Sequence, residues 1–203
     1  MTLTREFDFT DVSAPITFSF RTWYDLEEDY DYLYFEVSED GQHWQIITTP
    51  SGTGEDPSGN SYGWAYNNVT DGWIEESIDL SDYAGKQVFV RFEYVTDAAV
   101  NGEGMLIDDV SVEAVDYFSD FESDDGGWEA DGFVRVQNAL PQTFRLALIK
   151  EGSTTTVEMI VVNADQTAEI PISIGGEVDS VTLVVSGTTR FTREVGSYMV
   201  EIK

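Results

Sequence analysis

The stretch Trp23–Gly41, WYDLEEDYDYLYFEVSEDG, decides how the first half of the chain folds. Apolar and polar residues alternate on both sides of its acidic centre, which is the period of half-buried β-strands. One strand is predicted to end at the start of this stretch and another to run from Asp31 to Ser38. A hairpin turn follows at Gly41, because glycine supplies the positive φ that a tight turn requires. The stretch therefore predicts two strands joined by an acidic turn.

The acidic turn carries no lysine or arginine. Eight carboxylates lie between positions 25 and 40: Asp25, Glu27, Glu28, Asp29, Asp31, Glu36, Glu39 and Asp40. Asp31 shares its parity with the apolar residues Leu33 and Phe35, so it is expected to face the core. A carboxylate buried there needs a partner, and with few bases nearby a hard cation is the best available one. We therefore predict one side of a calcium site here; the alternative is a solvated acidic hairpin tip.

The other side of this site is expected in the strand Met105–Val112, MLIDDVSV. Asp108 shares its parity with Leu106 and Val110, which places one member of the Asp108–Asp109 pair toward the core. Calcium binds about six to eight oxygen atoms, often from distant segments. The predicted ligands come from the acidic turn, this strand and the loop before it: Asp25, Glu27, Asp31, Asp108, Asp109, Asp97 and Glu103.

Short alternating runs separated by Gly, Asn, Asp and Pro continue along the whole chain, which predicts an all-β protein. About eight such runs precede residue 113, with long polar loops at 50–63 and 96–104. This pattern is typical of a jelly-roll β-sandwich over residues 1–115. An acidic link then leads to a smaller β-sandwich-like domain within residues 116–203. Its expected strands are 133–136, 143–149, 155–162, 168–174, 180–186 and 198–202.

Composition excludes several partners. The 203 residues hold 39 acidic and 10 basic side chains, a net charge of −29. Such a chain repels nucleic acids and anionic lipid headgroups. No apolar run approaches the roughly 18 residues of a membrane helix, so no membrane insertion is expected. With no cysteine, there is no disulfide framework.

Catalysis is not expected from this chain. His43 is its only histidine, and cysteine is absent, so neither an H-E-x-x-H zinc site nor a cysteine nucleophile can be built. A serine triad would need the same histidine, and the G-x-S-x-G context is missing. His43 follows the hairpin turn and is predicted to be exposed.

Aromatic side chains suggest a binding surface. Tyr32 and Tyr34 share one face of the predicted strand, and Trp64 and Trp73 lie in or near the long polar loop. Exposed rings of this kind can stack on sugars, so these four are candidate ligand-binding residues. The alternative is that the rings fill the sandwich or cover its outer face.

Several segments in the same order resemble a known family: LTREFDF, WYDLEEDYDYLYFEVSEDG, GNSYGW and GWIEESIDLSDYAGKQVFVRFEYVTDAAVNGEGMLIDDVSV. They are similar to the MAM-like jelly-roll module of immune inhibitor A-type secreted metallopeptidases, over about residues 2–115. FESDDGGWEADGFVRVQNALPQTF and VTLVVSGTTRFT resemble the C-terminal tail of such proteins.

This resemblance implies an extracellular, calcium-stabilised and non-catalytic accessory region of a protease, serving in stabilisation or targeting. The implied partner is the attached protease domain or a cell-surface polymer such as a glycan. Three alternatives stay open: an independent carbohydrate-binding module, a calcium-dependent adhesive subunit of a surface assembly, and a haloadapted domain without a specific ion.

Overall fold

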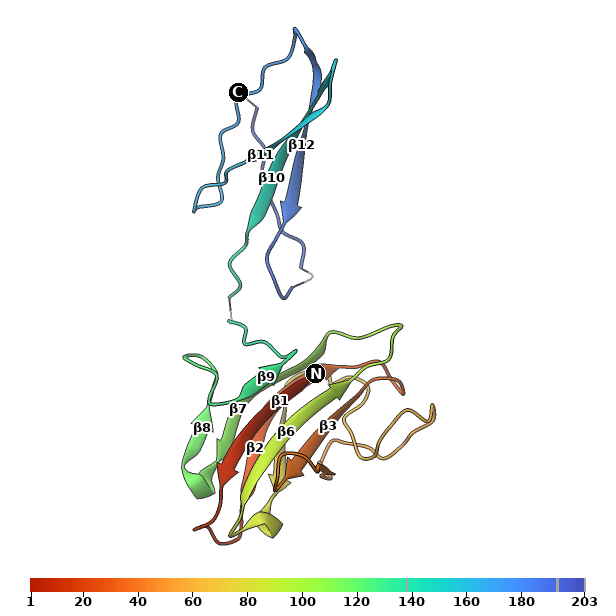
Figure 1. The fold of residues 1–203 in the computed structure, drawn as a ribbon, viewed down its shortest axis with the longest axis vertical. Coiled ribbons are helices and arrows are strands. Elements are labelled where there is room, and N and C mark those ends of the chain that lie inside the picture. The colour runs from red at the N-terminus through yellow and green to blue at the C-terminus, as the bar shows by residue number, and fades with distance from the viewer. Residues whose placement is uncertain (138, 193, 203) are drawn as a thin grey trace. The chain divides into compact units, whose positions relative to one another are not determined.

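A computed structural model describes residues 1–137, 139–192 and 194–202 (Figure 1). The chain divides into two compact units, Met1–Arg135 and Val136–Lys203. Regular structure in the described residues is almost entirely β, as predicted. The helical segments among them are two short 3-10 turns, Ser81–Tyr83 and Glu113–Val115, and none is long and apolar enough to cross a membrane.

The first unit is an antiparallel β-sandwich of two sheets. One sheet has the order β4-β3-β6-β1-β9 and the other β5-β2-β7-β8. The strands are β1 (Thr2–Asp8), β2 (Thr17–Asp25), β3 (Tyr32–Ser38), β4 (Gln45–Ile46), β5 (Ile74–Asp79), β6 (Gln87–Val95), β7 (Gly104–Val112), β8 (Tyr117–Ser119) and β9 (Glu129–Asp131). The predicted all-β sandwich is confirmed.

Aromatic rings from both sheets interlock in the core. Phe18 of β2 lies 5.1 Å from Phe35 of β3, and Phe20 lies 5.1 Å from Phe92 of β6, measured between ring centroids. These side chains are at most 1% exposed. Alternation along each strand sends one set of rings inward, and aromatic pairs at these separations add to the hydrophobic stabilisation of the sandwich.

The first unit extends beyond the expected boundary at residue 115. β8 pairs with β7, and β9 pairs with β1. Between them, Trp128 is 4% exposed and its ring lies 5.8 Å from that of Phe92. The segment expected to be a polar link therefore supplies two strands and one core side chain, and the unit ends at Arg135.

β3 is buried on both faces. The long polar loop predicted over 50–63 leads into a segment that runs back along β3. There the N–H of Tyr66 donates to the carbonyl of Leu33, and the carbonyl of Tyr66 accepts the N–H of Leu33. The ring of Tyr62 stacks over Tyr34 at 5.7 Å. Tyr32 and Tyr34 are consequently 1% exposed each. The return strand predicted over 43–49 is shorter, because only Gln45–Ile46 pairs with β3.

A β-bulge in β7 changes the direction of its side chains. β2 pairs Ser19 with Ser111 but Arg21 with Asp108, so one extra residue is accommodated around Asp109, whose φ is 49°. The extra residue reverses the alternation. Leu106 is 42% exposed as a result. Asp108 pairs with the outward-facing Arg21, and Asp109 lies beside the same side chain, so neither acid takes the inward position that the alternation predicted for one member of the pair.

The second unit contains one three-stranded antiparallel sheet in its described residues. Its order is β11-β10-β12, formed by β10 (Phe144–Gly152), β11 (Thr156–Ile160) and β12 (Val178–Gly187). Leu148 is 1% exposed at its centre. The strands expected over 133–136, 168–174 and 198–202 do not form in the described residues. Alternating sequences become strands only where a neighbouring edge can pair with them.

Candidate metal centre

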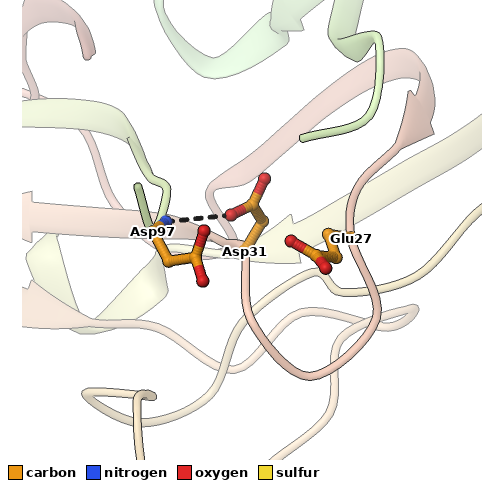
Figure 2. Close-up of side chains that lie close together, drawn as sticks. All are labelled: Glu27, Asp31 and Asp97. Carbon is orange, nitrogen blue, oxygen red and sulfur yellow. Dashed lines mark hydrogen bonds between the residues drawn. The ribbon is translucent and has the colours of Figure 1, made fainter. Parts of the chain in front are cut away.

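Three carboxylates converge at one end of the sandwich (Figure 2). One oxygen each from Glu27, Asp31 and Asp97 lies within 4.8 Å of the others. Glu27 and Asp31 belong to the acidic turn before β3, and Asp97 follows β6. Asp31 and Asp97 are 66 positions apart in the sequence. They are brought together because β3 and β6 are neighbours, with Tyr32 paired to Val95.

Local hydrogen bonds shape the acidic turn. The backbone carbonyl of Glu27 accepts the N–H groups of Tyr30 and Asp31 at 3.3 and 3.1 Å. Asp29 adopts a left-handed backbone with φ of 66°, a conformation that aspartate tolerates better than most residues. The turn thereby folds the Glu27 side chain back toward Asp31.

Asp31 is completely buried, as its parity predicted, and it is held by two donors. The hydroxyl of Tyr94 donates to Oδ2 at 2.8 Å, and the backbone N–H of Asp97 donates to Oδ1 at 3.1 Å. Figure 2 shows the second of these bonds, which fixes the start of the 96–104 loop against the turn.

The charge of this cluster is not balanced by a base. In the described part of the chain, no lysine, arginine or histidine forms an ion pair with any of the three acids. Burial raises the pKa of Glu27, and the charges of Asp97 and Asp31 raise it further. Burial, the hydrogen bond with Asp31 and the surrounding acids likewise raise the pKa of Tyr94.

One oxygen of this cluster lacks a partner. Oε2 of Glu27 is buried and makes no hydrogen bond. A buried unpartnered oxygen, beside two further carboxylates and without a base, is a donor set suited to a hard cation. The oxygen-only chemistry fits Ca²⁺ better than Zn²⁺, which favours nitrogen and sulfur ligands. These residues therefore fit the predicted cation.

The other predicted calcium ligands lie outside this cluster. Asp25 ends β2 opposite Gly104, next to the 96–104 loop, and Glu103 is exposed in that loop. Asp108 is four residues beyond Gly104, about 13 Å along β7 at the usual rise per residue. Asp109 lies 3.9 Å from Arg21 on the outer side of the sheet. The structure thus pairs the acidic turn with Asp97 and not with the Asp108–Asp109 pair.

The predicted aromatic ligand residues do not form one surface. Tyr32 and Tyr34 are buried beneath the 50–66 loop. Trp64 is partly buried and donates its indole N–H to the carbonyl of Thr49 at 3.1 Å. Trp73 is 51% exposed just before β5. Of the four, Trp73 is the ring most available to a ligand.

Two groups were missed from the sequence. Tyr94, the donor to Asp31, shares its parity with Phe92 and could have been identified as an inward-facing hydroxyl. Glu76 is completely buried between the sheets, where Tyr66 donates to its Oε2 at 3.0 Å and its Oε1 has no partner. Glu76 is two residues from the apolar Ile78 and shares its face of the strand, so the alternation in the sequence could have identified Glu76 as inward-facing.

A known family model covers the whole first unit. The family model "Immune inhibitor A-like, MAM domain" matches residues 1–138. Immune inhibitor A of Bacillus thuringiensis subsp. alesti is 37% identical over 132 residues, 63% of this chain and 18% of that protein.

Two further relatives match a shorter segment. Pre-pro-metalloprotease PrtV of Vibrio cholerae is 32% identical over 100 residues, 49% of this chain and 10% of that protein. Bacillopeptidase F of Bacillus subtilis is 32% identical over 99 residues, 48% of this chain and 6% of that protein. The chain thus spans less than a fifth of the length of these curated relatives.

Proposed function

This chain belongs to the family of immune inhibitor A-like MAM domains, and from that premise we propose that it is a calcium-stabilised, non-catalytic accessory module of a secreted metallopeptidase. The observation that carries the calcium proposal is the cluster of Glu27, Asp31 and Asp97 with its unpartnered buried oxygen. The module would stabilise or target the protease to which it is attached.

Bound calcium would be held by the carboxylates of Glu27, Asp31 and Asp97. Its charge would compensate three acids that have no base beside them. The acidic turn and the 96–104 loop would then be joined by the ion as well as by the N–H of Asp97. Calcium needs about six to eight oxygen ligands, so carbonyl groups or water would complete the shell.

Two observations support the accessory role. The named relatives are proteases of which this chain matches only a small part, from 6% to 18%. The single histidine cannot supply an H-E-x-x-H motif. An extracellular location would suit a calcium site, because extracellular modules commonly bind calcium at roughly 10⁻⁴–10⁻³ M.

The calcium proposal is tested by thermal unfolding with EGTA and with calcium. An ion that binds only the folded state at a hundredfold excess over Kd stabilises it by about 2.7 kcal/mol. We expect calcium to raise Tm in the wild type. Asp97→Asn should abolish this rise, because it removes one charged ligand at an exposed position while an oxygen remains to accept the N–H of Ala99.

Asp108→Asn is the matched control. It removes a carboxylate of the same kind from β7, outside the cluster, so the rise of Tm with calcium should persist. A Tm unchanged by calcium in the wild type would refute the site. Loss of the calcium effect in Asp108→Asn, with Asp97→Asn unaffected, would instead assign the ion to the Asp108–Asp109 pair.

A further inference from the structure

The outer face of the β5-β2-β7-β8 sheet carries a groove that no part of the proposed calcium site uses. Its volume is about 990 Å³, and side chains from all four strands line it. The side chain of Phe18, between Thr17 and Ser19 of the groove, is completely buried and points into the core on the opposite face of this sheet. Its composition identifies the kind of ligand that it can take.

A row of hydroxyls crosses the sheet and ends in an aromatic ring. Ser19 on β2 pairs with Ser77 on β5 and with Ser111 on β7, and Ser111 pairs with Phe118 on β8. Residues paired directly across neighbouring strands lie on the same face. The Phe118 ring is 61% exposed, so it offers an apolar surface beside groups that both donate and accept hydrogen bonds.

A row of alternating charges runs alongside, two residues or about 7 Å further along the strands. Arg21 pairs with Glu75 and lies 3.9 Å from Oδ2 of Asp109. The side chains of Arg21 and Asp109 are 60% and 43% exposed. Arg21 thus has an acidic residue as a neighbour on each adjacent strand, and the three side chains are accessible to a ligand.

Aromatic and apolar side chains continue the same face beyond the groove. Trp23 pairs with Leu106, which is 42% exposed. Trp73, 51% exposed, directly precedes Ile74, which pairs with Thr22, so it lies at the same end of the sheet as Trp23. The polar centre of the face is therefore bordered by rings at both ends.

We propose that this face binds an uncharged saccharide chain. Sugar hydroxyls both donate and accept hydrogen bonds, which matches a surface where serines, one guanidinium and carboxylates alternate. The rings of Trp73 and Phe118 suit the apolar faces of sugar rings. The inference adds a ligand to the targeting role proposed above, but it does not depend on calcium.

Charge and backbone pairing disfavour other occupants. The groove holds Glu75, Asp109 and Glu113 against Arg21, so polyanions such as nucleic acids or sulfated glycans are repelled. An extended peptide binds most readily at a free strand edge. β2 and β7 are inner strands, each paired on both sides, so the centre of this face offers a peptide few main-chain groups.

The test is binding of the whole chain, in calcium, to an array of neutral oligosaccharides that includes β-glucans, mannans and chitooligosaccharides. We expect at least one to bind. Trp73→Ala and Phe118→Ala should each weaken it about tenfold, equal to about 1.4 kcal/mol. Tyr62→Ala is the matched control: Tyr62 is 73% exposed but stacks on Tyr34 of the other sheet, so binding should be unchanged.

Thermal unfolding of each variant separates loss of a contact from loss of the fold. Weakened binding at an unchanged Tm supports the inference. No binding to any neutral oligosaccharide would overturn it, as would equal binding by all variants. If only an arginine-rich peptide binds, and Trp73→Ala and Phe118→Ala abolish that binding, the ligand of this face would be a basic peptide and not a saccharide. If the saccharide test fails but calcium still raises Tm in the wild type, the saccharide inference is overturned and the calcium proposal stands.

Discussion

At the scale of the residue, burial of acids within an acidic protein distinguishes this molecule. Asp31 is completely buried, yet its two donors are a phenol and a backbone N–H, neither of which carries charge. Removing a carboxylate from water is costly unless it is hydrogen-bonded and compensated. The hydrogen bonds are present, and the compensating charge is what the proposed calcium would supply.

The single histidine gives a prediction that concerns one hydrogen bond. His43 Nδ1 lies 2.7 Å from Oδ2 of Asp40, and both side chains are exposed. This bond and the charge of Asp40 raise the pKa of His43 above its usual 6.5. Asp40 also accepts the backbone N–H groups of His43 and Gln42, and these bonds lower the pKa of its carboxyl group.

NMR titration of the His43 ring should therefore give a pKa above 6.5 in the folded protein. Because the folded pKa is raised, the pair stabilises the fold fully below the unfolded value and loses this contribution as pH rises through the folded value. Asp40→Asn should return the pKa of His43 toward 6.5. An equal pKa in wild type and Asp40→Asn would show that the hydrogen bond is not formed.

At the scale of the element, short segments complete the sandwich. β8 and β9 have three residues each, but β9 pairs with β1, which would otherwise be an edge strand. Arg5 of β1 donates to the carbonyl of Gly126 at 3.0 Å, and its guanidinium lies 4.1 Å from the ring centroid of Tyr117. Residues 116–131 are therefore part of the first unit and not a linker.

Trp128 is the side chain that this segment places in the core of the first unit. Removing its ring tests whether the first unit extends beyond residue 115. Its ring contacts Phe7, Phe18 and Phe92, and its indole N–H donates to the Tyr117 hydroxyl at 2.9 Å. Trp128→Ala should lower the free energy of unfolding by about 3–5 kcal/mol, since it leaves a large cavity. Urea denaturation of the isolated first unit measures this loss.

The control for Trp128→Ala is Trp73→Ala, which removes the same ring from a half-exposed position. Surface changes of this kind usually stay within about 0.5 kcal/mol. Equal stability losses in the two variants would contradict the packing of Trp128 in the core. A first unit ending at residue 115 should also be less stable than one ending at residue 135.

At the scale of the whole molecule, the net charge of −29 opposes compaction through self-repulsion. Raising NaCl from about 0.01 M to 0.15 M shortens the screening length from about 30 to 8 Å. We expect Tm to rise over this range in the absence of calcium, because repulsion between exposed carboxylates weakens. Thermal unfolding in EGTA at several NaCl concentrations measures the effect.

This salt effect should be the same in wild type and in Asp97→Asn, since one charge among so many changes little. The calcium effect should differ between them. A rise of Tm with calcium that molar NaCl reproduces, and that Asp97→Asn retains, would favour general haloadaptation over a specific ion. The dependence of Tm on NaCl thus reports the charge of the whole surface, and its dependence on calcium reports the cluster of Glu27, Asp31 and Asp97.

The sequence by itself determined the class of fold and much of the candidate site. Alternation identified the strands of the first unit as far as residue 112 and the inward direction of Asp31, because a side-chain period of two follows from strand geometry alone. Gly41 adopts the positive φ of 69° that its turn required. The order of motifs identified the family, which the match over residues 1–138 confirms.

The tertiary structure decided which distant segments meet. Asp97 joins the acidic turn because β6 lies beside β3, whereas the bulge at Asp109 turns Asp108 away from the core. Tyr34 is buried because the 50–66 loop folds over it. Alternation specifies the face of a residue within its own strand, but strand neighbours, bulges and loop coverage depend on packing among segments far apart in the sequence.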